Sequence, residues 1–227
     1  MTRRFALLAL PLMIVLTAAT PAPRGRTPPA AAQPLPDAVR VVLTTESGAI
    51  ELELDHKHAP ITVENFVRYV DQRRFDGIVF YRAMKLDWGT PPNGLIQAGT
   101  RGDPKRVLRP IAHEPTNATG LKHLVGALSM ARYAPGTANG DFSILLSDMP
   151  GLDAKPEATD PEANAGYAVF GRVTAGMDVV RRIYDVPISP TLGEGFMRGQ
   201  MLAKPVRVIT ARRVATPPAL PPVSSKP

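Results

Sequence analysis

Histidines that stand close together are the first side chains to consider for chemistry in this sequence. His56 and His58 lie two residues apart in a predicted loop before Pro60, and His113 precedes Glu114 in a second loop. A zinc site needs three or four ligands, and neither pair has a further ligand nearby in the sequence. We therefore predict solvated turns here and no metal site.

Nucleophiles are equally scarce. The chain has no cysteine, which excludes a disulfide framework, a thiolate metal site and a cysteine nucleophile. Ser129 and Ser143 lack the G-x-S-x-G turn that exposes a hydrolase serine. The sequence thus does not favour a bond-breaking enzyme, and we predict no cofactor.

The net charge of +7 does not by itself indicate a nucleic-acid partner. Arg3, Arg4, Arg24 and Arg26 precede the predicted folded region, and removing these four charges leaves +3 for the rest of the chain. The other arginines and lysines occur singly or in pairs, with no longer basic run and no interleaved aromatic residues. We therefore predict that the protein does not bind nucleic acid.

The first residues have the pattern of a secretory signal. Arg3 and Arg4 are followed by an apolar stretch at residues 5–16 and then by small residues. The apolar stretch is short for a transmembrane helix. We predict a signal peptide over residues 1–19 with cleavage after Ala19; cleavage after Ala22 and an uncleaved anchor are the alternatives.

Proline content separates a folded domain from two tails. Residues 20–36 hold six prolines and residues 216–227 hold five, whereas the whole chain is 44% hydrophobic and 21% charged. This distribution predicts a Pro/Ala-rich spacer over residues 20–37, one domain over residues 38–215, and a disordered tail over residues 216–227.

Local patterns in the domain predict a β-barrel. Apolar residues alternate with glutamates at residues 50–54, which together with residues 39–45 predicts a hairpin. Apolar residues at helical spacing predict a helix from a cap at Thr62 to residue 72. Further strands are predicted at residues 78–82, 94–98, 127–131, 142–146, 167–173 and 206–214, a second helix at 177–184, and an exposed loop at 148–165. We expect a mainly β fold, a closed eight-stranded antiparallel barrel capped by two α-helices.

Several stretches resemble cyclophilins. Residues 166–173, GYAVFGRV, with GMDVV at 176–180, resemble the bacterial periplasmic branch of that family. Residues 44–54, 59–69, 75–82, 95–99 and 127–132 resemble other cyclophilin segments in the same order. The resemblance implies a peptidyl-prolyl cis-trans isomerase in the periplasm of a Gram-negative cell, monomeric, free of the membrane after signal cleavage, acting on proline-containing segments of exported proteins.

Such an enzyme twists an X-Pro amide without breaking a covalent bond. The barrier is about 18–20 kcal/mol because amide resonance is lost. A fixed cation that donates to the proline nitrogen favours the twisted state, and arginine suits that task. The resemblance implies that Arg82 is this catalytic residue and that Gln97 binds substrate backbone. A surface arginine and an ordinary polar strand residue are the alternatives.

The resemblance also implies a substrate pocket. Met130 matches a pocket wall, and Ala131 matches a backbone rail for the peptide. Phe142 and Leu152 match apolar pocket positions, and Tyr167 stands where many members carry histidine and the periplasmic branch carries tyrosine. Core packing is the alternative for Met130 and for these three residues.

The sequence departs from the family pattern at the pocket. Asp141 replaces a glutamine and Ser143 replaces the phenylalanine of the pocket floor, so we expect a more polar pocket in which Asp141 competes with substrate for Arg82. The segment between Arg82 and Gln97 is long. Its Trp88 either supplies the lost aromatic wall or covers the barrel mouth.

Two other functions stay open. Asp141 and Ser143 favour a barrel that binds proline segments as a chaperone or assembly factor with little turnover. An envelope scaffold that binds through its Pro-rich tails is the third possibility. Arg82 favours the isomerase.

Overall fold

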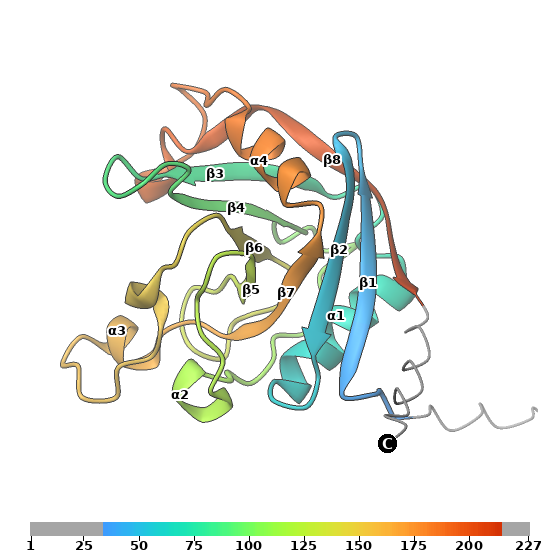
Figure 1. Ribbon diagram of the computed structural model, residues 1–227, viewed down its shortest axis with the longest axis vertical. Helices are drawn as coiled ribbons and strands as arrows, with labels where there is room; N and C mark the ends of the chain where they lie inside the picture. The colour runs from blue at the N-terminus through green and yellow to red at the C-terminus, as the bar shows by residue number, and fades with distance from the viewer. Residues whose placement is uncertain (1–33, 215–227) are drawn as a thin grey trace, which may run out of the picture. The chain divides into compact units, whose positions relative to one another are not determined.

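The computed structural model describes residues 34–214, and these form a closed β-barrel of eight strands (Figure 1). Their order around the barrel is β1-β2-β7-β5-β6-β4-β3-β8, and every neighbouring pair is antiparallel. The predicted fold is therefore confirmed. The strands are β1 (Ala38–Thr45), β2 (Gly48–Asp55), β3 (Val79–Lys85), β4 (Gly94–Gly99), β5 (Ala127–Met130), β6 (Phe142–Leu145), β7 (Val169–Ala175) and β8 (Met201–Val214).

Two helices of more than two turns pack on the barrel, as predicted. They are α1 (Pro60–Asp71) and α4 (Met177–Asp185), and they lie toward opposite ends of β2 (Figure 1). The described chain also has the short helices α2 (Thr116–Thr119) and α3 (Pro161–Ala165) and the 3-10 turns η1 (Pro150–Leu152) and η2 (Gly195–Met197). The helix prediction missed these because one turn of helix has no apolar periodicity.

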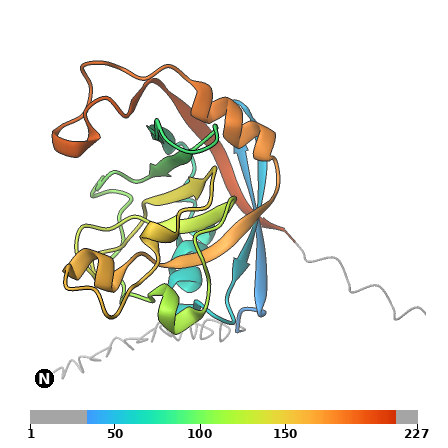
Figure 2. The same cartoon turned by 60° about the vertical axis from the view of Figure 1, so that its left-hand side comes forward.

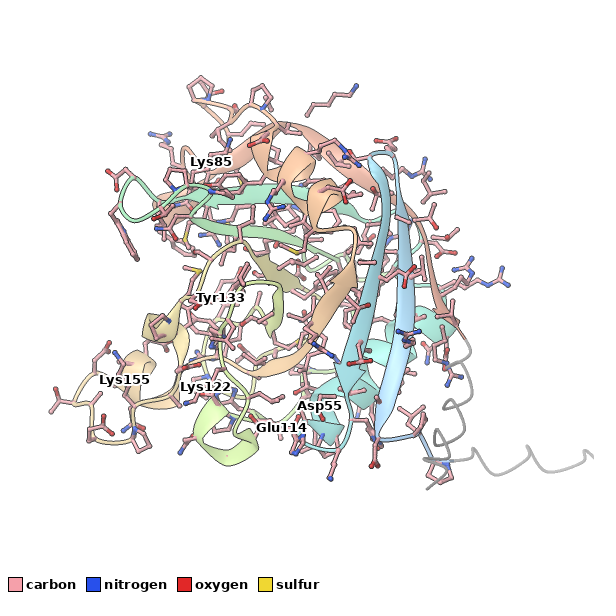
Figure 3. The ribbon with its side chains drawn as sticks, viewed as in Figure 1. Asp55, Lys85, Glu114, Lys122, Tyr133 and Lys155 are labelled. Carbon is pink, nitrogen blue, oxygen red and sulfur yellow. The ribbon has the colours of Figure 1, made fainter. Side chains whose placement is uncertain are left out.

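The predicted cap of α1 is wrong. The helix begins at Pro60, which has no N–H to satisfy and therefore suits the first helical position. The acceptor for the free N–H groups is Glu114, whose carboxylate accepts from Ile61 N at 3.1 Å and from Thr62 N at 2.7 Å. Thr62 donates its hydroxyl to the same carboxylate. Figure 3 shows Glu114 beside this helix.

The barrel interior is filled by aromatic rings. Phe66 of α1 lies with its ring centroid 5.1 Å from that of Phe142 and 4.9 Å from that of Phe75. Phe142 is fully buried, and Phe80 packs against its edge at 6.3 Å. These contacts join the helix to strands β3 and β6 and fix the barrel wall on which the pocket is built.

Strand β8 begins five residues earlier than predicted. The predicted strand began at Val206, directly after Pro205, and a proline has no backbone N–H to donate to a ladder. In the structure this proline lies where the β3–β8 pairing shifts register, between the pairs Phe80–Val206 and Arg82–Met201. A proline is tolerated at such a bulge. The early start pairs Met201 with Arg82, and η2 lies in the loop that leads into β8 (Figure 2).

Within residues 34–214, no helix has the length and apolarity needed to cross a bilayer. The predicted signal peptide, most of the spacer and the tail lie outside the described residues.

Candidate active site

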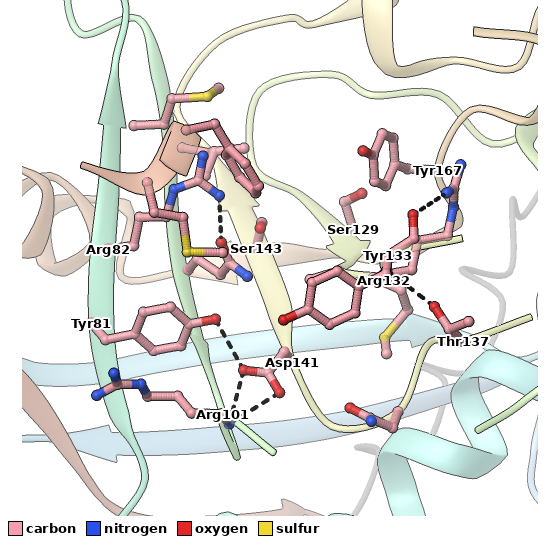
Figure 4. Close-up of a pocket in the computed structure, with 18 of the residues that line it drawn as sticks. Tyr81, Arg82, Arg101, Ser129, Arg132, Tyr133, Thr137, Asp141, Ser143 and Tyr167 are labelled. Atoms are coloured by element: carbon pink, nitrogen blue, oxygen red, sulfur yellow. Dashed lines mark hydrogen bonds between the residues drawn. The ribbon is translucent and has the colours of Figure 1, made fainter. Parts of the chain in front are cut away.

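A pocket of about 550 Å³ opens over strands β3, β4, β5 and β6 (Figure 4). Eight of the ten residues predicted for the site line it: Arg82, Gln97, Met130, Ala131, Asp141, Ser143, Leu152 and Tyr167.

A bulge in β3 brings two consecutive side chains to this pocket. Phe80 pairs with Ala98 and Arg82 pairs with Gln97, so Tyr81 is an extra residue on its strand. Successive strand residues normally point to opposite faces, and a bulge resets that alternation. Tyr81 and Arg82 therefore both line the pocket.

The Arg82 guanidinium is held from two sides. Its Nη1 donates to Gln97 Oε1 at 2.7 Å. Its Nε and Nη2 donate to Gln200 Oε1 at 2.8 and 2.5 Å. Partial burial lowers the pKa of Arg82 from its ordinary value, yet an arginine remains charged at neutral pH. Arg82 is thus a cation held in a fixed orientation at the pocket.

Asp141 does not contact Arg82, which corrects the expectation that the two compete. Its carboxylate accepts from the Tyr81 hydroxyl at 3.0 Å, from Thr100 Oγ1 at 3.1 Å and from the Arg101 N–H at 3.1 Å. Figure 4 shows the hydrogen bonds that join Asp141 to Tyr81 and Arg101. The strand bulge explains the difference, because it places Tyr81 where its hydroxyl reaches the carboxylate. Burial raises the pKa of Asp141, and burial with that neighbouring carboxylate raises the pKa of Tyr81.

Replacing Asp141 by asparagine should stabilise the protein at neutral pH. Since the folded carboxyl has the higher pKa, its contribution to the free energy of unfolding falls as the pH rises from about 3.8 through the folded pKa. We expect the variant to have a higher Tm than the wild type at pH 7, where the wild-type carboxyl is the less stabilising group, and a smaller gain at pH 3. Calorimetry at pH 7 and pH 3 measures this, with Asp87→Asn in an exposed loop as control. A gain that is equal at both pH values would contradict the argument.

The pocket floor is a row of polar side chains across three strands. Ser143 of β6 pairs with Gln97 of β4 on one side and with Ser129 of β5 on the other. Ser143 and Ser129 are both buried. The floor is therefore polar not only at Ser143, as expected from the sequence, but also at the paired residues Gln97 and Ser129.

Ser129 belongs to a buried chain of hydrogen bonds that the sequence did not predict. Its hydroxyl lies 2.9 Å from His123 Nε2, and His123 Nδ1 lies 2.7 Å from Asp153 Oδ1. Burial lowers the pKa of His123, which favours the neutral ring. Ser129 is only 4% exposed and sits within a strand, so its hydroxyl lacks the exposed turn of a hydrolase nucleophile. We interpret this chain as a support for the floor.

The walls are built from the predicted residues and their neighbours. The Ala131 N–H already donates to the Asp141 carbonyl at 2.9 Å, so only its carbonyl remains for a bound peptide. Tyr167 donates its backbone N–H to Leu152 at 2.9 Å, and the Arg132 guanidinium lies 4.5 Å from the Tyr167 ring centroid. The pocket wall on this side is consequently aromatic and cationic.

Phe142 and Trp88 do not line the pocket, which corrects both predictions. Phe142 points into the barrel, where its ring packs on Phe66, whereas the next residue of the strand, Ser143, lies on the opposite face and lines the pocket. Trp88 is 62% exposed in the loop between β3 and β4 and neither walls the pocket nor closes it. Hydrogen bonds of Asn93 hold this loop in place. The Asn93 side chain donates to the Trp88 carbonyl and accepts from the Ser147 hydroxyl.

The sequence also missed several pocket residues. Phe196, Met197 and Met201 line the pocket from η2 and the start of β8, and Arg101 and Tyr133 line it from loops. An isolated phenylalanine between glycines in a polar loop was the one local signal for Phe196. None of the others differs from an ordinary loop or strand residue in the sequence.

Comparison with known proteins agrees with this geometry. Residues 40–211 match the family described as "Cyclophilin type peptidyl-prolyl cis-trans isomerase/CLD". A peptidyl-prolyl cis-trans isomerase of Acinetobacter baylyi is 37% identical over 176 residues, which cover 76% of this chain and 84% of the relative. Peptidyl-prolyl cis-trans isomerase A of Dickeya dadantii is 36% identical over 150 residues, covering 64% and 71%.

The fold is shared with solved structures. A cyclophilin-type isomerase of Cryptosporidium parvum superposes with a TM-score of 0.62 at 20% identity, over 79% of this chain and 99% of that one. The same protein crystallised in the presence of the dipeptide Ala-Pro gives a TM-score of 0.61 at 19% identity, over 78% and 99%. With its family match, its relatives and its barrel, this chain belongs to the cyclophilin-type peptidyl-prolyl cis-trans isomerases.

Proposed function

We propose that the protein isomerises X-Pro bonds of exported proteins and that Arg82 stabilises the twisted amide. The observation that supports this proposal is that the Arg82 guanidinium is held by hydrogen bonds that leave two of its N–H groups unused. An arginine has five N–H donors, and three of those of Arg82 are used by Gln97 and Gln200. One N–H on each of Nη1 and Nη2 remains for a substrate.

The reaction follows from those two donors. As the X-Pro bond rotates, the proline nitrogen loses its resonance and gains a basic lone pair. An N–H of Arg82 that meets this lone pair lowers the energy of the twisted state more than that of the planar state, which is what acceleration requires. Gln97 accepts from Arg82 through its oxygen, so its amide NH₂ is left to donate to a substrate carbonyl.

The substrate class follows from the pocket. Apolar side chains of Met130, Leu152 and Phe196 line the same cavity of about 550 Å³ as Arg82, which suits a proline ring with flanking backbone. The dipeptide Ala-Pro used with the Cryptosporidium protein is of this chemistry. A protease-coupled isomerisation assay on an X-Pro peptide tests the proposal. It fails if the wild-type protein leaves the uncatalysed rate unchanged.

We further propose that the protein acts as a monomer in the periplasm after cleavage of residues 1–19. The basic start and short apolar stretch of the sequence support this. Mass spectrometry of protein recovered from the native cell envelope should find Thr20, or a residue within a few positions of it, at the mature N-terminus. Membrane-bound protein that retains residues 1–16 would show an anchor instead.

A proline-segment-binding chaperone is the second candidate, and the polar floor of Gln97, Ser143 and Ser129 favours it. This floor makes transfer of a proline ring less favourable. It predicts that Ser143→Phe tightens binding of an Ala-Pro peptide, by at most about 1.5–3 kcal/mol for a fully buried ring. Titration of the folded variant measures this, and Ser143→Ala serves as the control for loss of the hydroxyl. Equal affinities for the phenylalanine variant and the wild type would show that position 143 is not the floor.

A further inference from the structure

The turn at residues 194–200 joins α4 to β8 and reaches the cation of the site. Its end is tied to β3, because the Ala83 N–H donates to the Gln200 carbonyl at 2.9 Å. The residue before the turn packs closely against its middle, because Gly193 has φ +93° and an added Cβ would lie 2.6 Å from the Met197 carbonyl oxygen. The turn is therefore held against the strand that carries Arg82.

Gln200 makes two of the three side-chain hydrogen bonds of Arg82. Its Oε1 accepts from Nε and Nη2, whereas Gln97 Oε1 accepts from Nη1 alone. With only one contact at Nη1, the planar guanidinium could pivot about that atom. A second acceptor on the opposite edge removes this freedom, and it leaves the two unused N–H groups pointing in fixed directions.

Phe196 is an exposed aromatic residue at the edge of the pocket. Its side chain is 69% exposed, yet it lines the pocket and the Arg82 guanidinium carbon lies 5.5 Å from its ring centroid. The other aromatic side chains along the pocket, Tyr81, Tyr133 and Tyr167, carry hydroxyl groups. Phe196 is thus the purely hydrocarbon ring next to the cation, and a bound proline ring would cover it.

We propose that the turn at residues 194–200 is a working part of the site, in which Gln200 is a positioning residue for Arg82 and Phe196 is a wall that contacts substrate. The inference rests on the proposed function, because it assigns roles in that reaction. It separates the two roles by the parameter that each controls. Orientation of the cation acts on the rate, and the wall acts on binding.

Gln200→Ala should lower kcat for an X-Pro peptide by about 3- to 30-fold with little change in KM, the scale of losing hydrogen bonds to a charged group. Gln200→Glu keeps an acceptor oxygen and should recover most of the rate. Gln72→Ala is the matched control, since Gln72 Oε1 accepts from Arg74 Nε at 2.7 Å away from the pocket. A kcat for Gln200→Ala equal to that of the control overturns the positioning role.

Phe196→Ala should raise KM by about 5- to 50-fold with kcat largely kept, because an apolar wall is lost from the bound state. Phe196→Leu should recover part of the affinity. Trp88→Ala is the control, because Trp88 is exposed to a similar extent and lies outside the pocket. If the KM of Phe196→Ala equals that of the control, Phe196 is not a wall that contacts substrate.

Two readouts do not depend on turnover. The NMR signal of the Arg82 Nε–H should be displaced in Gln200→Ala, and the Kd of an Ala-Pro peptide should rise in Phe196→Ala. If Arg82→Ala is inactive but both turn variants behave as their controls, the inference is wrong and the proposed function stands. If the wild type does not accelerate isomerisation, the proposed function fails; unchanged NMR and Kd values in the turn variants then also reject the inference.

Discussion

Arg82→Ala should lower kcat/KM for an X-Pro peptide by about 10- to 1000-fold, a loss of about 1.4–4 kcal/mol of transition-state stabilisation. The Arg82 guanidinium is held by Gln97 and Gln200 at the pocket, and in the mechanism we propose its two unused N–H groups act on the twisted amide rather than on the planar one. A protease-coupled assay on a chromogenic peptide measures the change.

Arg82→Lys should recover little of this activity. A flexible ammonium can neither bridge Gln97 and Gln200 nor keep the planar fork that fixes the free donors. Arg172→Ala, which removes an exposed arginine paired with Glu53 at 2.8 Å, controls for the loss of a positive charge. If Arg82→Ala retains wild-type efficiency, the mechanism proposed for this site is wrong.

Phe142→Ala should lower the free energy of unfolding by about 3–5 kcal/mol, the usual cost of truncating a buried phenylalanine. Its ring fills the barrel interior between Phe66, Phe75 and Phe80, with centroids 5.1, 5.6 and 6.3 Å away. Urea denaturation followed by circular dichroism measures the change.

The same variant separates core from pocket. Under conditions in which Phe142→Ala is still folded, KM should stay near its wild-type value, because the ring does not line the pocket. Ser143→Ala, one residue along the strand, should change stability little. A large rise in KM with only a small loss of stability would return Phe142 to the substrate site.

The barrel was predictable because its strands and long helices carry local patterns. Ile50, Leu52 and Leu54 alternate with charged residues, and in the structure these three side chains face the core. Arg82 and Gln97 were found through a family resemblance, and the β3–β4 register places them side by side. Arg82 and Gln97 lie on strands that are consecutive in the sequence, so motifs close together in the sequence are enough to locate both residues.

The rest depends on contacts between distant residues, which leave no local pattern. Gln200 is 118 positions from Arg82, and Glu114 is 52 positions from Thr62, whose predicted capping role it takes. Asp141 contacts Tyr81 instead of the expected Arg82 for a related reason. A one-residue bulge in β3 placed Tyr81 beside the carboxylate, and nothing in the sequence marks that bulge.

The pairing of β8 with both β1 and β3 sets an order in time. The last strand of the domain closes the barrel against the first one, and its first residues follow directly after the glutamine that holds the cation. Contacts between the two ends of a domain are formed late, since a long loop must be closed before they are made. A growing chain therefore completes the site proposed here only after the final strand has emerged and docked, and we expect full isomerase activity only from a chain in which β8 has closed the barrel.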